Sequence, residues 1–118
     1  MAQFMLLLHD DPADFADVSP AEIQRIIGEY TAWRERLEAE GRLVGGRKLK
    51  DEGGRHMRRV GGEVRVVDGP YAEAKEVLGG YFEIEAADYD EAIAISRECP
   101  HLCYGGRIEL RQVDPLHD

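Results

Sequence analysis

Alternating apolar and polar positions divide most of the chain into short strands. Over residues 3–9, Phe4, Leu6 and Leu8 share one face, and Met5, Leu7 and His9 share the other. Because apolar side chains occur on both faces, we predict a central strand. Weaker or shorter patterns predict further strands over 42–50, 55–60, 63–67, 81–86 and 106–113, with Gly61-Gly62 as a hairpin turn between the second and third of these.

Helical spacing replaces alternation in two segments. Ser19, Pro20 and Glu22 supply an N-cap, a first-turn proline and a capping box, so a helix is predicted from Pro20 to Glu40. Its apolar stripe comprises Ile23, Ile26, Ile27, Tyr30, Trp33 and Leu37. A second helix should begin after Asp88 and end at Pro100, with Tyr89, Ala92, Ile93 and Cys99 as candidate buried positions. A short helical turn is expected over 72–77.

The order of these elements is strand, long helix, strands, then strand, helix, strand. This order predicts one α+β domain over residues 1–118 with a ferredoxin-like (split βαβ) layout and both helices on one face of the sheet. The last two strands then keep a polar second face, formed by Tyr81, Glu83, Glu85, Arg107, Glu109 and Arg111. That face is open to water, lines a cleft or meets another subunit.

Charge narrows the classes of partner. The formal net charge is −9, which disfavours binding to nucleic acid. No apolar run approaches the length of a membrane span, so we expect no membrane partner and a cytoplasmic location. Residues 41–61 nevertheless hold seven basic and two acidic side chains. This basic middle suits a small anionic ligand or the acidic surface of a second subunit; the alternative is a solvated hairpin.

The segment Asp68-Gly69-Pro70-Tyr71, followed by Leu78-Gly79-Gly80-Tyr81-Phe82, resembles the DGPF motif of the YCII-related family, with Tyr71 where Phe usually stands. The opening Met5–Leu8, the helical Asp90–Ile93 and the closing Gly106–Arg111 also fit that family. The resemblance implies a ferredoxin-like fold that forms a homodimer through its sheet, as a dimeric α/β barrel. The wider superfamily includes ring-modifying lyases and isomerases, some with a His–Asp pair proposed as catalytic.

His9 and Asp68 are the candidate catalytic residues. Imidazole titrates near neutral pH, and an adjacent carboxylate fixes its tautomer and stabilises its cation. Each residue ends a predicted strand, where functional sites often lie. Two observations favour a structural alternative: Asp68 can cap its own turn, and His9 stands in a different sequence context from the family's proposed histidine.

Five further residues are candidates for binding substrate. Arg47 can clamp an anion, and Glu73 and Lys75 match polar positions of the motif. Tyr71 and Tyr81 can line a cleft and donate their hydroxyls. The structural alternatives are a helix start for Glu73, an interface ion pair for Lys75, and core or interface packing for the two tyrosines.

Cys99 and Cys103 are too few for a disulfide framework. With His101 they form Cys-Pro-His-Leu-Cys, which contains good zinc ligands in a spacing unlike that of a zinc finger. We therefore expect no metal and no cofactor, with core or incidental cysteines as the default and a reversible Cys99–Cys103 disulfide as an alternative.

Two hypotheses for function remain. The first is a small cofactor-free lyase or isomerase in which His9 transfers protons and Asp68 orients it. The second is a non-catalytic module that binds a small ligand or a protein partner in a regulatory role.

Overall fold

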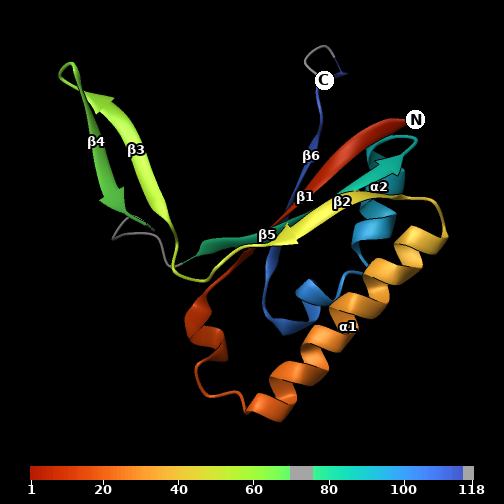
Figure 1. The fold of residues 1–118 in the computed structure, drawn as a ribbon. Coiled ribbons are helices and arrows are strands. Elements are labelled where there is room, and N and C mark those ends of the chain that lie inside the picture. Colours follow the sequence, from red (N-terminus) through yellow and green to blue (C-terminus); the bar gives the residue numbers. More distant parts are fainter. Residues whose placement is uncertain (70–75, 116–118) are drawn as a thin grey trace.

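The computed structural model describes residues 1–69 and 76–115 (Figure 1). Within these ranges, six strands, two α-helices and two short 3₁₀ helices follow one another along the chain. Their order is β1 (Ala2–Asp10), η1 (Pro12–Phe15), α1 (Pro20–Ala39), β2 (Leu43–Lys48), β3 (Arg55–Val60), β4 (Glu63–Asp68), β5 (Val77–Ala86), α2 (Tyr89–Ser96), η2 (Pro100–Tyr104) and β6 (Arg107–Gln112).

Four strands form one antiparallel sheet in the order β2-β5-β1-β6. Both α-helices cover the same face of this sheet, as Figure 1 shows. The arrangement is a mixed α+β architecture that is compatible with a ferredoxin-like fold. In the described part of the chain, neither α-helix has the length and the apolar composition that a transmembrane helix needs.

The core lies between the sheet and the helices. Phe4 and Leu6 of β1 and Ile84 of β5 are completely buried there. Trp33 and Leu37 of α1 pack against the same cluster. The alternating pattern of β1 is therefore confirmed, since every second residue contributes to this core and the intervening residues face the other side of the sheet.

The predicted start of α1 is confirmed by its hydrogen bonds. The Ser19 hydroxyl accepts from the backbone N–H of Glu22 at 3.2 Å, and Pro20 begins the helix. The helix ends at Ala39, one residue before the predicted end, and Gly41 follows with a φ of +74° that favours glycine. Ile27 of the predicted apolar stripe is 49% exposed, because the buried stripe of α1 is narrower and consists of Ile26, Trp33 and Leu37.

Several predicted boundaries are wrong. β5 begins at Val77 rather than at residue 81, so the final residue of the expected helical turn over 72–77 lies in a strand; residues 70–75 are outside the described part. α2 ends at Ser96, and Pro100 opens η2 instead of ending the α-helix. Tyr89 and Ile93 are exposed, because this two-turn helix buries Ala92 and Ser96.

The Gly45-Gly46 pair shapes the pairing of β2 with β5. The pairing of β2 with β5 shifts register between Leu43 and Gly45, which is a β-bulge or similar irregularity. A Cβ at Gly46 would lie 2.8 Å from the carbonyl oxygen of Tyr81. The strand therefore needs glycine where it approaches β5 closely.

β3 and β4 form a separate two-stranded sheet. The turn at Gly61-Gly62 has positive φ angles of 59° and 85°, as the predicted hairpin requires. Figure 1 shows this hairpin projecting from the end of the four-stranded sheet, on the side away from α1 and α2.

Candidate functional site

The sheet face opposite the helices, here called the open face, carries most of the candidate residues that the structure describes. Pairing across the strands aligns Arg47 of β2 with Tyr81 of β5, Tyr81 with Leu7 of β1, and Leu7 with Glu109 of β6. Directly paired residues point to the same face of an antiparallel sheet. Arg47, Tyr81 and Glu109 therefore form one row across the open face, with Leu7 between the last two.

His9 lies two residues beyond Leu7 on the same face. Its Nε2 is 3.1 Å from Oε1 of Glu109, and the two side chains are 18% and 36% exposed. Nη1 of Arg111 donates to the other oxygen of this carboxylate at 3.1 Å. These hydrogen bonds, Arg111 first and His9 second, lower the pKa of Glu109 below its usual value. Glu109 is therefore ionised at neutral pH and accepts the Nε2 proton of His9.

The backbone of His9 is fixed from behind the sheet by His101. This histidine is 4% exposed, and its Nε2 lies 2.8 Å from the carbonyl oxygen of His9. Because a carbonyl only accepts, Nε2 of His101 must carry the proton. Its Nδ1 then accepts from the hydroxyl of Tyr30 at 2.8 Å, and burial raises the pKa of Tyr30, which keeps that hydroxyl protonated.

The hydrogen bond from His101 reaches β1 at an irregularity of the strand. The register between β1 and β5 shifts between Leu8 and His9, so that His9 pairs with Leu78 rather than with Gly79. A Cβ at Gly106 would lie 2.3 Å from Nε2 of His101, so the chain must have glycine where it passes that ring. The bulge and the buried histidine together define where the His9 side chain leaves the strand.

Asp68 has a different partner. One of its carboxylate oxygens lies 3.2 Å from Nε of Arg55, and its side chain is 86% exposed at the end of β4. Within the described residues, no hydrogen bond or ion pair joins Asp68 to His9. The described contacts thus give His9 another carboxylate, and a catalytic role for Asp68 stays a prediction.

The remaining candidates divide by whether the structure describes them. Tyr71, Glu73 and Lys75 lie outside the described residues. Arg47 is exposed and Tyr81 is half-buried, both on the open face. Their roles in binding a substrate stay predictions.

The three candidate metal ligands of the Cys-Pro-His-Leu-Cys segment differ in exposure and in partners. Cys99 is buried and Cys103 is exposed, and both thiols are free. Both ring nitrogens of His101 are already used by Tyr30 and by the backbone of His9. Among the residues described, no cluster of three or more His, Cys, Asp or Glu side chains is suited to a metal ion.

Two hollows border the sheet. One, of about 460 Å³, lies where the end of β2, the base of the hairpin and the start of β5 meet; its lining includes Lys50, His56, Glu76 and Leu78. Leu78 is the residue that pairs with His9, so this cleft adjoins the same end of the sheet. Glu76 also pairs with Arg107 at 3.0 Å.

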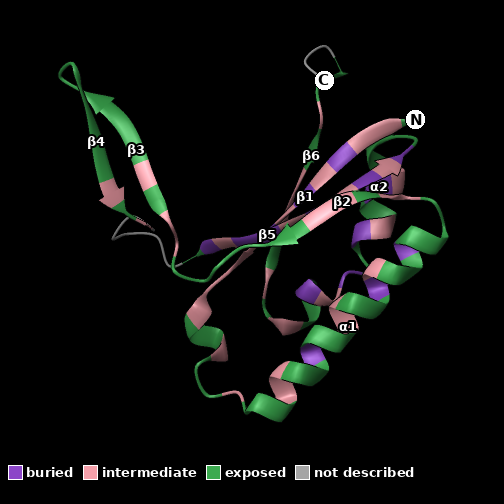
Figure 2. Ribbon diagram, viewed as in Figure 1, coloured by how far each residue is buried: buried purple, intermediate pink, exposed green. Residues whose placement is uncertain are grey.

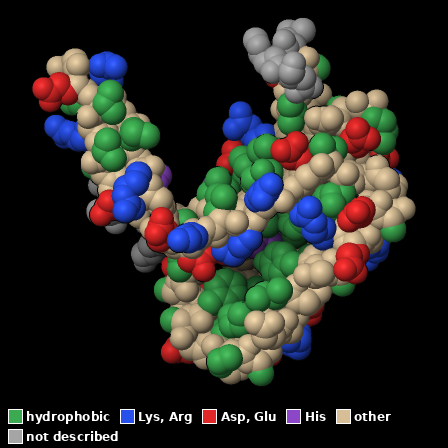
Figure 3. Space-filling model, viewed as in Figure 1, with side chains coloured by type: hydrophobic (Ala, Val, Ile, Leu, Met, Phe, Trp, Pro, Cys, Tyr) green, Lys and Arg blue, Asp and Glu red, His purple; other side chains and the backbone are tan. Residues whose placement is uncertain are grey.

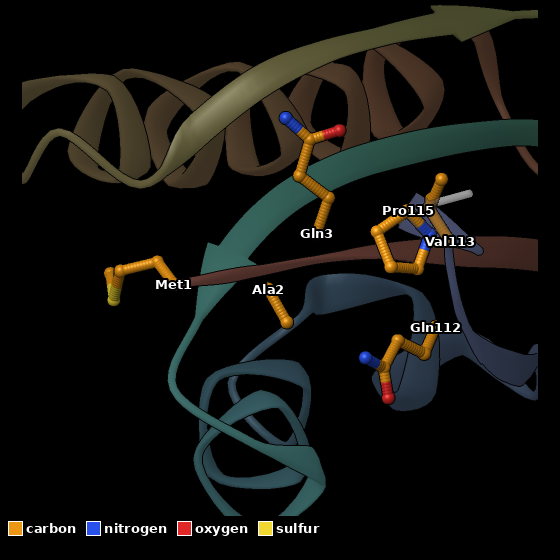
Figure 4. Close-up of a pocket in the computed structure, with 6 residues that line it drawn as sticks. All are labelled: Met1, Ala2, Gln3, Gln112, Val113 and Pro115. Atoms are coloured by element: carbon orange, nitrogen blue, oxygen red, sulfur yellow. The ribbon is translucent and has the colours of Figure 1, made fainter. Parts of the chain in front are cut away.

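The second hollow, of about 290 Å³, lies at the opposite end of the sheet, where β1 begins and β6 ends (Figure 4). Figure 4 shows Gln3 pointing away from Ala2 and Gln112, as alternation along a strand requires. The described residues of its lining contribute no ionisable side chain.

The fold and the site together define a class: a small α+β protein with an imidazole–carboxylate pair on the open face of its sheet. The chain belongs to the YCII-related domain family, whose domain matches residues 2–117. It is also similar to uncharacterized protein R00369 of Rhizobium meliloti (strain 1021), with 29% identity over 96 residues, covering 80% of this chain and 77% of that protein.

Two residues of the site were not singled out from the sequence as its components. Glu109 was placed only on a polar strand face, and His101 was considered only as a metal ligand. Alternation along 106–113 does place Glu109 on the same side as Arg107 and Arg111, which is the one local signal that pointed to it. His101 gave no such signal, because its two partners, Tyr30 and His9, lie 71 and 92 residues away in the sequence.

Proposed function

We propose that the protein belongs to the DGPF branch of its family and works as a homodimer in which two open faces pack together as an α/β barrel. Within that barrel, His9 transfers protons to and from a small anionic organic molecule. The reaction class is a cofactor-free lyase or isomerase reaction. The observation that carries this proposal is the hydrogen bond of His9 to an ionised Glu109. Two free thiols suit the cytoplasm as its compartment.

The composition of the open face supports the homodimer. Met5, Leu7 and Tyr81 are apolar or aromatic and lie near the middle of this face, and neither α1 nor α2 covers them. Charged side chains surround them, including Arg47, Glu83 and Glu109. An apolar centre within a polar rim is typical of a surface that associates with another protein.

The geometry supports acid–base chemistry at His9. Glu109 accepts the Nε2 proton, so the lone pair of the neutral imidazole is on Nδ1. Within the described residues, Nδ1 has no hydrogen-bond partner and can act as the base. It removes a proton from a carbon next to a carbonyl or carboxylate, and the imidazolium, stabilised by Glu109, returns that proton to another atom of the same molecule.

Arg47 and Tyr81 are proposed to hold the substrate. They lie two strands and one strand from β1, or roughly 10 and 5 Å across the sheet. A small carboxylate bound by the Arg47 guanidinium can therefore extend past the Tyr81 hydroxyl toward β1 and His9.

Proton exchange in D₂O tests this function without a known product. A panel of small oxo acids and cyclic organic acids is incubated with the protein, and ¹H NMR follows the loss of C–H signals. We expect exchange of at least one compound, a loss of roughly 100-fold or more in His9→Gln, and a smaller loss in Glu109→Gln. His56→Gln, in the hairpin, is the matched control. Equal exchange by wild type and His9→Gln would rule out this role for His9.

A non-catalytic binding module is the second candidate. The cleft that adjoins the His9 end of the sheet favours it, because its lining combines Lys50 and Glu76 with apolar Leu78. This alternative predicts that a panel compound shifts the NMR signals of these residues without any exchange of its own protons.

A further inference from the structure

One face of the β3–β4 hairpin is apolar and uncovered. Cross-strand pairing places Met57 opposite Val66, and Arg59 opposite Val64, so all four side chains share this face. Met57, Val64 and Val66 are 66%, 53% and 55% exposed. We call this surface the inner face of the hairpin; the outer face carries Val60, among others.

Within the described residues, the hairpin forms a sheet separate from the four-stranded one. An isolated two-stranded hairpin is marginally stable in water unless its apolar face packs against something. Three large apolar side chains on one short hairpin therefore indicate a surface that is buried in an assembly.

Charge indicates what covers this face. Residues 55–68 carry four arginines and two carboxylates, a net charge of +2, whereas the rest of the chain carries 11 basic and 22 acidic side chains, a net charge of −11. A second copy of the same chain thus offers the hairpin a strongly acidic body. The net charge of −9 of the whole chain also makes nucleic acid a poor partner.

Individual residues repeat this complementarity. Glu83 and Glu85 follow each other on the open face, and neither forms an ion pair within the described part of the chain. Arg59 likewise has no carboxylate partner among the described residues; it donates only to the carbonyl of Gly62. Among the described residues, the open face therefore has acidic groups, and the inner face of the hairpin a cation, that form no ion pair.

The position of the hairpin brings these two surfaces within reach of each other in a dimer. It projects on the side of the sheet away from the helices (Figure 1), which is the side on which a copy packed against the open face would lie. Figure 3 shows hydrophobic side chains along the hairpin and a hollow between the hairpin and the body.

We propose that the β3–β4 hairpin is a clasp for a second copy of this chain. Met57, Val64 and Val66 pack against the flank of the partner, and Arg59 meets the carboxylates of its open face, Glu83 and Glu85. The proposal rests on the homodimer of the proposed function, and it adds to the packed sheets a contact between the hairpin and the partner's open face and flank.

Sedimentation equilibrium of the full chain tests the clasp. Met57→Asp and Val66→Asp change the inner face at positions that are exposed in the subunit, so each variant should fold normally. We expect each to weaken dimerisation roughly tenfold or more, equivalent to about 1.4 kcal/mol. Val60→Asp, on the outer face and 41% exposed, is the matched control and should change dimerisation less than about threefold. Equal weakening by all three substitutions would overturn the proposal.

Charge reversal tests the second part of the contact. Arg59→Glu should weaken the dimer, and the double variant Arg59→Glu/Glu85→Arg should recover part of the loss. Absence of any recovery in this variant and in Arg59→Glu/Glu83→Arg would overturn this pairing.

Different results would contradict the clasp and the homodimer. If Leu7→Asp dissociates the dimer while Met57→Asp and Val66→Asp leave it intact, the clasp is wrong and the packed sheets stand. A wild-type chain that stays monomeric at high concentration overturns both, and the inner face would then serve a different partner.

Discussion

The four-stranded sheet and the β3–β4 hairpin differ in whether one of their faces is buried. In the sheet, β1 and β5 alternate between a buried face and an open face, and the helices cover the buried one. In the hairpin, no residue is buried, as Figure 2 shows by the absence of purple from β3 and β4. Both regions contain Val, Met and Arg in strands, so residue type alone does not determine whether a strand side chain is buried.

The difference shows which apolar side chains are buried within the subunit and which are left exposed by it. Burial of apolar side chains against α1 stabilises the subunit by itself. If the proposed clasp forms, the exposed apolar side chains of the hairpin contribute to stability only in the dimer. The predictions below test this comparison, from the largest expected effect to the smallest.

Truncation of a core residue should cost far more than truncation of a hairpin residue. Leu6 is completely buried and Val66 is 55% exposed. Leu6→Ala should lower the free energy of unfolding by about 2–5 kcal/mol, because it removes buried methyl groups and leaves a cavity. Val66→Ala should change it by less than about 0.5 kcal/mol under monomeric conditions. Urea unfolding measures both, and similar losses would contradict the comparison.

Loss of the buried hydrogen bonds of His101 should rank second. His101→Leu leaves the Tyr30 hydroxyl and the His9 carbonyl without their partner, at a cost of about 1–3 kcal/mol. In a double-mutant cycle with Tyr30→Phe, the two losses should be less than additive, because the second substitution removes an already orphaned hydroxyl. Arg59→Gln, which removes an exposed hydrogen bond of the hairpin, should change stability by less than about 0.5 kcal/mol.

A smaller, pH-dependent effect is expected at Asp10, at the end of β1. Burial raises the pKa of this carboxyl above its usual value, although His101 acts in the opposite direction. Because the folded-state pKa is the higher one, the ionised form destabilises the fold, and stability from this group is gained as pH falls through that pKa. Asp10→Asn should therefore raise Tm at pH 7, and the gain should disappear below about pH 3, where Asp10 is protonated in both states. A gain that is equal at both pH values would assign the effect to something other than ionisation.

The smallest effect concerns reactivity rather than stability. Cys103 is exposed, whereas burial raises the pKa of the Cys99 thiol to about 11. A thiol-specific reagent at pH 8 should label Cys103 rapidly, and Cys99 only as the core opens, because the thiolate is the reactive form. Mass spectrometry of the labelled peptides distinguishes them. Equal labelling rates in the native protein would show that the core around Cys99 is open to solvent.

The sequence by itself determined the order of the strands and α-helices, but not all of their boundaries or buried positions. Alternation separated the two faces of β1, Ser19 and Pro20 identified the start of α1, and Gly61-Gly62 identified the hairpin turn. These features depend on side chains that are near one another in the chain, so local patterns are enough to predict them. The order of the elements was likewise enough to predict an α+β architecture.

Only the tertiary structure decided which side chains meet. His9 and Glu109 are 100 residues apart, and their contact depends on the register of β6 on β1 and on the shift after Leu8. A change of register by one residue would move Glu109 to the opposite face of the sheet. The same holds for His101, which the sequence showed only as a member of a cysteine-flanked cluster. The packing of α1 and of η2 against the sheet brings the His101 ring between Tyr30 and the carbonyl oxygen of His9. This packing is a property of the whole fold, so no local pattern predicts it.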